Sequence, residues 1–81
     1  MVDVPMDDRF PGDWRVLRGL TQPQLGKIAG VSTSAIGRIE RGEGGLSAST
    51  RDSIASALGI SPEELAAAFV RARTRPGGDP A

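Results

Sequence analysis

The sequence contains no cysteine, histidine or tyrosine, and its 81 residues include only two phenylalanines and one tryptophan. Without cysteine, no disulfide can cross-link the fold and no thiolate can bind a metal ion. Without histidine, the commonest general base and metal ligand are missing. A long apolar run is also absent, and the acidic start MVDVPMDDRF is typical of neither a signal peptide nor a membrane span. We therefore expect a cytoplasmic protein that holds no metal and no cofactor.

The length of the chain allows one small domain and no second hydrophobic core. Catalytic patterns are missing as well, because no nucleophile–base pair and no phosphate-binding loop is visible. Glu63 and Glu64 are adjacent, so on a helix their side chains point about 100° apart and cannot form a carboxylate dyad. The sequence therefore predicts a protein that is not an enzyme.

The segment Leu20–Gly42, LTQPQLGKIAGVSTSAIGRIERG, has the pattern of two short helices joined by a tight turn. Thr21 can cap the first helix, and Pro23 falls in its first turn, where the missing N–H costs nothing. Gly30 tolerates the left-handed conformation of a helix end. Ser32 can cap the second helix. This layout predicts a helix-turn-helix, in which the second helix lies in the DNA major groove.

The two predicted helices separate into an apolar and a polar side. Gly26 would let the helices approach closely, because it carries no side chain. The residues expected in the core are Leu25, Ile28, Ala29, Val31, Ile36 and Ile39. The residues left on the outer face of the second helix are Thr33, Ser34, Gly37 and Arg38.

Three further helices complete an all-α fold, a compact bundle of about five short helices in which helices 2 and 3 form the helix-turn-helix. The first is expected from about Asp13 to Arg18, with Trp14 and Leu17 in the core. The fourth starts at Ser47 or Ser49, buries Ile54 and Leu58 and ends at Gly59, and the fifth runs from the capping box Ser61–Glu64 to about Arg73. Residues 1–12 are expected to be mostly irregular, 13–74 to form the domain, and 75–81 to be a flexible tail.

The stretch from about 14 to 66 resembles the repressor/Cro-like (lambda-repressor-like, XRE-type) helix-turn-helix family of bacterial and phage regulators. The matching residues are GLTQ at 19–22, Leu25, Gly30-Val31-Ser32, Ile36, Ile39-Glu40, Gly42, ALGIS at 57–61 and Glu64-Leu65. The expected DNA-binding residues are Gln22, Lys27, Thr33, Ser34, Gly37, Arg38 and Arg41. The resemblance implies that Gln22 contacts a phosphate and that Thr33, Ser34 and Arg38 face base edges.

The resemblance also pairs Arg15 with Glu40, which would tie the first helix to the end of the third; the alternative is two separate surface charges. Two positions depart from the family pattern. At Arg51 the family prefers an apolar residue, so either the fourth helix is rotated or the arginine stem lies over apolar surface. Glu43 stands where many relatives carry a basic or polar residue near phosphates, and its negative charge argues against DNA contacts from the 43–46 loop.

The net charge of zero is the main objection to DNA binding, because phosphate neutralisation supplies much of the affinity. The distribution of charge along the chain meets part of this objection. Residues 15–41 carry a net charge of +4, whereas residues 1–14 and 42–64 each carry −3. We therefore expect a basic reading face and an acidic back.

Two functions remain open. The favoured one is a sequence-specific double-stranded DNA-binding transcriptional regulator, a repressor above all, of a bacterium, phage or mobile element. The alternative is a protein-interaction module or antitoxin-like partner with weak or no DNA binding. The expected partners are an inverted-repeat operator and a second copy in a weak homodimer, with a further protein partner open and no membrane. Phe69 and Val70 are the candidate dimer contacts, unless Phe69 folds back onto Trp14 or Phe10.

Overall fold

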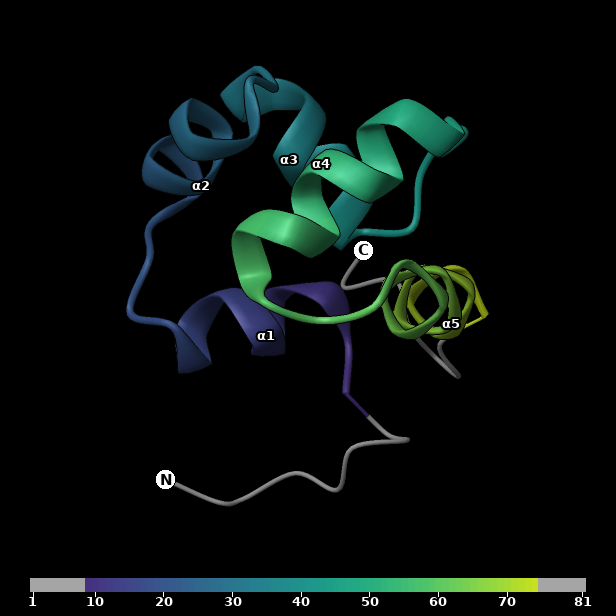
Figure 1. The fold of residues 1–81 in the computed structure, drawn as a ribbon. Helices are drawn as coiled ribbons and strands as arrows, with labels where there is room; N and C mark the ends of the chain where they lie inside the picture. Colours follow the sequence, from purple (N-terminus) through teal and green to yellow (C-terminus); the bar gives the residue numbers. More distant parts are fainter. Residues whose placement is uncertain (1–8, 75–81) are drawn as a thin grey trace.

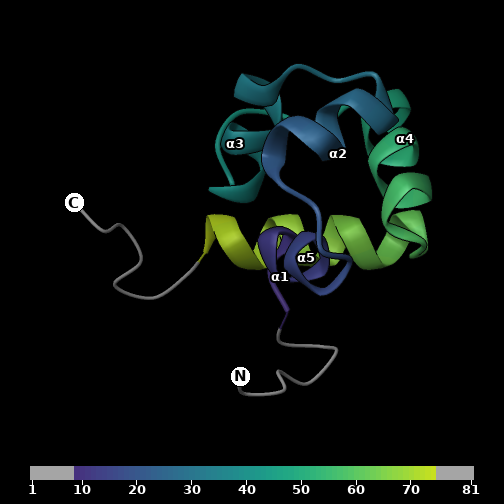
Figure 2. The same ribbon diagram turned by 90° about the vertical axis from the view of Figure 1, so that its left-hand side faces the viewer.

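Five α-helices and no strand make up residues 9–74, the part of the chain that the computed structural model describes (Figure 1). The helices are α1 (Pro11–Leu17), α2 (Gln22–Ala29), α3 (Thr33–Glu40), α4 (Ala48–Leu58) and α5 (Pro62–Arg73). In both views α2 and α3 lie above α1 and α5, and in Figure 2 α4 runs down one side to the level of α5 (Figures 1 and 2). The predicted all-α class is confirmed. The predicted tail at 75–81 and residues 1–8 of the predicted irregular start lie outside the described residues.

Helices α2 to α5 each begin at a serine or threonine whose hydroxyl accepts a hydrogen bond from the backbone N–H three residues further on. These caps and their donors are Thr21 with Gln24 at 3.2 Å, Ser32 with Ala35 at 3.1 Å, Ser47 with Thr50 at 3.2 Å and Ser61 with Glu64 at 3.1 Å. Each cap satisfies a backbone N–H that has no partner within its own helix. The caps predicted at Thr21, Ser32 and Ser61 are confirmed, and α4 starts at Ser47 rather than Ser49.

Helix α1 begins at Pro11, two residues before the predicted start at Asp13. The Phe10 N–H donates to the Asp13 carboxylate at 2.8 Å, and proline occupies the first helical position, where its lack of an N–H is harmless. Pro11 and Gly12, which were expected to lie outside the helix, therefore form its first turn. The predicted irregular segment 1–12 overlaps the helix by these two residues.

The core is built around five fully buried side chains, one or two from each of α2 to α5: Leu25, Ile36, Ile54, Leu58 and Leu65. Trp14 of α1 and Phe69 of α5 belong to the same buried cluster. The core positions predicted in α3 and α4 are confirmed. Helix α1 and helix α5, which lie below the motif, thus share one continuous core with it.

Two residues predicted to be in the core are exposed, Ile28 and Leu17. The side chain of Ile28 is 60% exposed. Helix α2 buries Leu25 and Gly26, and at 100° per residue that face lies roughly a third of a turn from Ile28. Leu17 is exposed for the same reason, because α1 turns Pro11 and Trp14 toward the core. In each helix one predicted core residue, Leu25 or Trp14, is buried. The predicted apolar side extends too far round each helix, so that Ile28 and Leu17 face solvent.

Phe69 is buried within the chain, so of the two alternatives for this residue the structure shows burial in the monomer and not exposure at a dimer contact. Its side chain is only 6% exposed, it lies in the same buried cluster as Trp14, and the Arg73 guanidinium sits 5.0 Å from its ring centre. Val70, the other candidate dimer contact, is 57% exposed. Burial in the core therefore removes Phe69 from any docking surface and leaves Val70 available.

Candidate nucleic-acid interface

The turn between α2 and α3 depends on the absence of a side chain at Gly26. A Cβ atom built there would overlap the Val31 carbonyl oxygen, and the Val31 N–H donates to the Gly26 carbonyl at 2.8 Å. Gly30 ends α2 in the left-handed region, with φ of 72°. The two glycines together fix the angle at which α3 leaves α2, so the outer face of α3 is held in a defined direction.

The outer face of α3 carries three of the residues predicted to read DNA. Thr33 and Ser34 lie exposed in the first turn, and Arg38 lies exposed one turn beyond Ser34. On the opposite side of the same helix, Ile36 and Ile39 are buried in the core. The structure therefore brings Thr33, Ser34 and Arg38 onto one exposed surface of a helix whose opposite side is packed in the core.

Gly37 was predicted on the outer face and is instead buried. It lies on that side of α3, but the side chains of Arg41 and Gln22 cover it. A Cβ atom at Gly37 would sit 3.3 Å from Arg41 Nη1 and 3.9 Å from the Gln22 amide group. The role of Gly37 in the structure is to leave room for two polar side chains, not to present a surface of its own.

Glu40, at the end of α3, accepts hydrogen bonds from side chains of two other helices, α1 and α2. Arg15 Nε donates to Glu40 Oε2 at 2.6 Å and Arg15 Nη2 donates to Oε1 at 3.2 Å, with the two side chains 18% and 12% exposed. Arg15 Nη1 also donates to the Leu20 carbonyl at 2.8 Å. Gln22, the residue expected at a phosphate, donates from Nε2 to Glu40 Oε1 at 3.0 Å. The carboxylate thus links α1 to α3 and fixes the position of the Gln22 amide.

Arg41 forms an ion pair that sequence reasoning missed. Its Nε donates to Glu43 Oε2 at 2.9 Å and its Nη2 to Glu43 Oε1 at 3.4 Å, and both side chains are more than half exposed. The hydrogen bond that Arg41 donates to Glu43, together with the negative charge of Glu43, raises the pKa of Arg41 above its ordinary value, whereas desolvation acts in the opposite direction. The available signal was the order arginine, glycine, glutamate, because Gly42 with φ of 73° folds the chain back between the two charges.

Most cations of residues 15–41, the segment with a net positive charge, are engaged within the protein. Arg15 and Arg41 are in ion pairs, and Arg18 Nε donates to the Leu58 carbonyl at the end of α4 at 2.7 Å. Within that segment, Lys27 and Arg38 are the two cations whose side chains make no hydrogen bond, ion pair or ring contact with residues 9–74. The expected basic reading face is consequently reduced to these two unpaired charges, beside cations whose charge is partly balanced.

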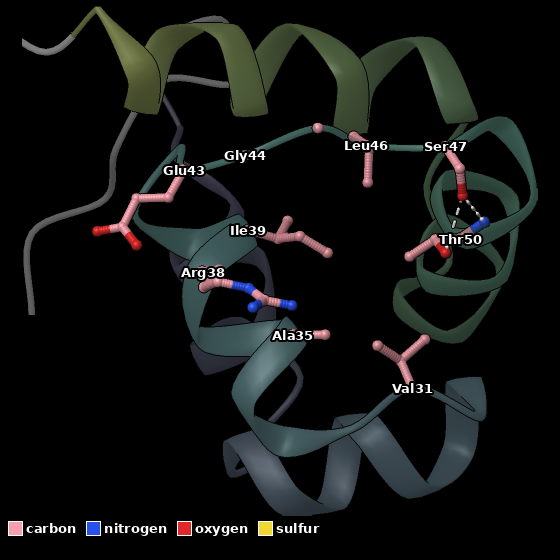
Figure 3. A pocket seen from close by; sticks show the side chains of 10 residues that line it. Val31, Ala35, Arg38, Ile39, Glu43, Gly44, Leu46, Ser47 and Thr50 are labelled. Carbon is pink, nitrogen blue, oxygen red and sulfur yellow. Dashed lines mark hydrogen bonds between the residues drawn. The ribbon is translucent and has the colours of Figure 1, made fainter.

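A groove of about 650 Å³ runs between α3 and the segment from Glu43 to the start of α4 (Figure 3). Its apolar lining comes from Val31, Ala35, Ile39 and Leu46, and its polar lining from Arg38, Glu43, Ser47 and Thr50. Figure 3 shows the Arg38 guanidinium extending into this groove and the Glu43 carboxylate pointing away from it. Arg38 therefore reaches from the outer face of α3 toward the capped N-terminus of α4.

Arg51 lies outside this groove, partly exposed, and its Nε donates to Asp52 at 3.1 Å. Among residues 9–74, no three acidic side chains gather into a set that would hold a metal ion. Within that same range, no helix has the length and apolar character needed to cross a membrane.

Comparison with known proteins gives one finding. A family model described as Helix-turn-helix matches residues 13–65, which span the chain from within α1 to the first turn of α5. Neither the comparison with curated proteins nor that with solved structures gives a significant match.

Proposed function

This chain belongs to the helix-turn-helix family of the repressor/Cro-like type, and on that premise we propose that it is a sequence-specific regulator that binds double-stranded DNA and represses transcription. The proposed site is the outer face of α3, inserted in the major groove. Members of this family are DNA-binding regulators, and the host is proposed to be a bacterium, a phage or a mobile element.

The observation that carries the proposal is that the Arg38 side chain is exposed and, within residues 9–74, unpaired. It is exposed, it has no partner among the described residues, and it projects from a helix whose buried side is fixed by Ile36 and Ile39. An arginine held in this way can donate two hydrogen bonds to the O6 and N7 atoms of guanine. The hydroxyl groups of Thr33 and Ser34 are short, so their base contacts would be few or mediated by water.

Phosphate contacts in this proposal come from Gln22, Lys27 and Arg41, which set the position of α3 on the duplex. Because Lys27 and Arg38 are the only two of the five cations of residues 15–41 whose side chains are unpaired within the described part of the chain, the affinity of one copy for DNA is modest. Two copies on an inverted repeat bind more tightly than one, since the second contact is made at high effective concentration. The proposed homodimer uses Val70 and not Phe69, which is buried in the core.

The test is footprinting of the full chain over the DNA upstream of its own gene, repeated over a range of salt concentrations. We expect two protected half-sites about one helical turn apart. We also expect the affinity to fall steeply with salt, because bound phosphates release counterions. Absence of a protected site at every salt concentration would contradict the proposal.

The second candidate is a protein-interaction module that keeps the fold and binds DNA weakly or not at all. It is favoured by one observation, the pairing of Arg41 with Glu43 at the end of the reading helix. A module of this kind would give no salt-dependent binding to any duplex, including a long mixed-sequence duplex at low ionic strength.

A further inference from the structure

The ion pair between Arg41 and Glu43 lies where α3 meets the proposed path of a DNA strand. Arg41 is the C-cap residue of α3 and falls on the same side of the helix as Ser34, about two turns away. Its guanidinium passes over Gly37 beside Gln22. Gln22 and Arg41 thus border one edge of the reading face, and both are expected to contact phosphates.

The geometry of the pair is the one with which arginine binds a phosphate. Two guanidinium nitrogens, Nε and Nη2, each face one oxygen of the Glu43 carboxylate, at 2.9 and 3.4 Å. Arginine binds phosphates through the same fork of N–H groups. The carboxylate therefore occupies the donors that a DNA phosphate would need.

Hydrogen bonds hold the backbone on both sides of Glu43, so the loop keeps the Glu43 carboxylate close to Arg41. The Glu43 N–H donates to the Arg38 carbonyl at 2.8 Å. Arg73 at the end of α5 donates from Nε to the Gly42 carbonyl at 3.1 Å and from Nη2 to the Gly44 carbonyl. Only rotation of the two side chains can open the pair. Because 58% of one side chain and 54% of the other are exposed, that rotation is open to competition from an external anion.

We propose that Glu43 is an intramolecular competitor for DNA phosphate, which holds Arg41 in the free protein and lowers the affinity for DNA. The inference rests on the proposed function and deepens it, because it names the residue that limits phosphate binding at this site. When a phosphate replaces the carboxylate, one ion pair is exchanged for another and little is gained. The displaced Glu43 carboxylate is then left close to the DNA backbone, which repels it.

The test compares Glu43→Gln with wild type in full-length protein binding to a duplex by fluorescence anisotropy across a salt series. We expect Glu43→Gln to bind roughly 3–10-fold more tightly, since an exposed pair is a weak competitor and its removal also ends the repulsion. The salt dependence should become steeper by about one counterion, because Arg41 now engages a phosphate without giving up a carboxylate. Glu63→Gln is the matched control: it removes the same charge from an exposed position in the first turn of α5, away from α3, and should change affinity less than twofold.

Arg41→Gln, made in the wild type and in the Glu43→Gln variant, completes a double-mutant cycle. It should weaken binding by several-fold more in the Glu43→Gln background than in wild type, because only there is the guanidinium free before binding. Equal losses in the two backgrounds, with equal salt dependence for wild type and Glu43→Gln, would overturn the inference and leave the proposed function standing. Failure of every variant to bind any duplex at low salt would overturn both. Unchanged thermal melting of Glu43→Gln would confirm that the comparison is made between folded proteins.

Discussion

Arg15 and Glu40, 25 positions apart in the chain, meet through two nearly parallel hydrogen bonds, 2.6 Å from Nε and 3.2 Å from Nη2. The same carboxylate also receives the Gln22 amide. A single acidic residue therefore joins the first helix to the reading helix and orients a residue expected at the DNA backbone. A change at Glu40 is therefore expected to affect both the stability of the fold and the position of Gln22.

Glu40→Ala is expected to lower the free energy of unfolding by about 3–5 kcal/mol, because it leaves the largely buried Arg15 guanidinium without its partner. In a domain of this size that loss is a large part of the total stability. Urea unfolding followed by circular dichroism measures it. The double change Arg15→Met, Glu40→Leu should be milder than Glu40→Ala, and strictly additive losses would show that the two side chains do not interact.

Arg38→Ala is expected to weaken binding to a specific site by about 1–3 kcal/mol and to relax the preference at one base pair. Its melting temperature should stay nearly the same, because the Arg38 side chain makes no hydrogen bond, ion pair or ring contact within residues 9–74. Competition with duplexes changed one base pair at a time measures both effects. Lys27→Ala is the control, as another unpaired cation of the motif, and should weaken all sequences alike. Uniform weakening by Arg38→Ala would instead place Arg38 at a phosphate.

Ser32→Ala is expected to destabilise the fold by about 1 kcal/mol, because the Ala35 N–H loses its acceptor at the start of α3. For a domain this small, the corresponding fall in melting temperature is roughly 4–8 °C. Ser34→Ala, two residues further on, is the matched control and should leave the melting temperature nearly unchanged, since its hydroxyl is exposed on the outer face. Equal shifts for both variants would remove Ser32 from the role of a cap.

Gly26→Ala is expected to destabilise the fold by about 1–3 kcal/mol, because the added methyl group overlaps the Val31 carbonyl oxygen and forces the turn to move. Gly45→Ala adds the same methyl group where nothing lies within 4 Å, and it should be neutral. Denaturant midpoints of the two variants test this directly. If Gly26→Ala also reduces DNA affinity beyond its effect on folding, the angle between α2 and α3 matters for recognition.

Val70→Glu is expected to leave the melting temperature unchanged and to weaken assembly of two copies on an inverted repeat, because Val70 is an exposed apolar residue on α5. Sedimentation with and without the duplex provides the measurement. Phe69→Ala is unsuitable for this purpose, since it would remove a core side chain and cost about 3–5 kcal/mol. A Val70→Glu protein that still assembles on the repeat like wild type would place the contact elsewhere or show that the copies bind independently.

The starts of α2, α3 and α5 and the turn were predictable because they depend on neighbours within four residues. The hydroxyls of Thr21, Ser32 and Ser61 reach their own helix ends, so a local pattern was sufficient. The exposure of Ile28 depends instead on how α2 is rotated by the close approach at Gly26, which no local spacing encodes. Burial of Phe69 likewise depends on where α1 places Trp14.

The candidate site likewise contains positions that the sequence could predict and side-chain contacts that it could not. The exposed positions of Thr33, Ser34 and Arg38 follow from helical spacing and from the inward side of Ile36 and Ile39. The pairing of the cations of residues 15–41 does not follow from helical spacing, because it depends on side-chain geometry across a turn or between helices. The sequence carried a net positive charge over residues 15–41, but the number of charges free to meet DNA is set by such pairing.

The burial of α5 bears on where the cooperative folding unit ends. The family match stops at residue 65, at the first core side chain of that helix. Ala68, Phe69 and Ala72 continue the buried face beyond it, and Arg73 fastens the loop that follows the reading helix. A recombinant fragment cut to the matched segment would expose this interior and release the loop, so the shortest autonomous unit must extend through the last turn of α5.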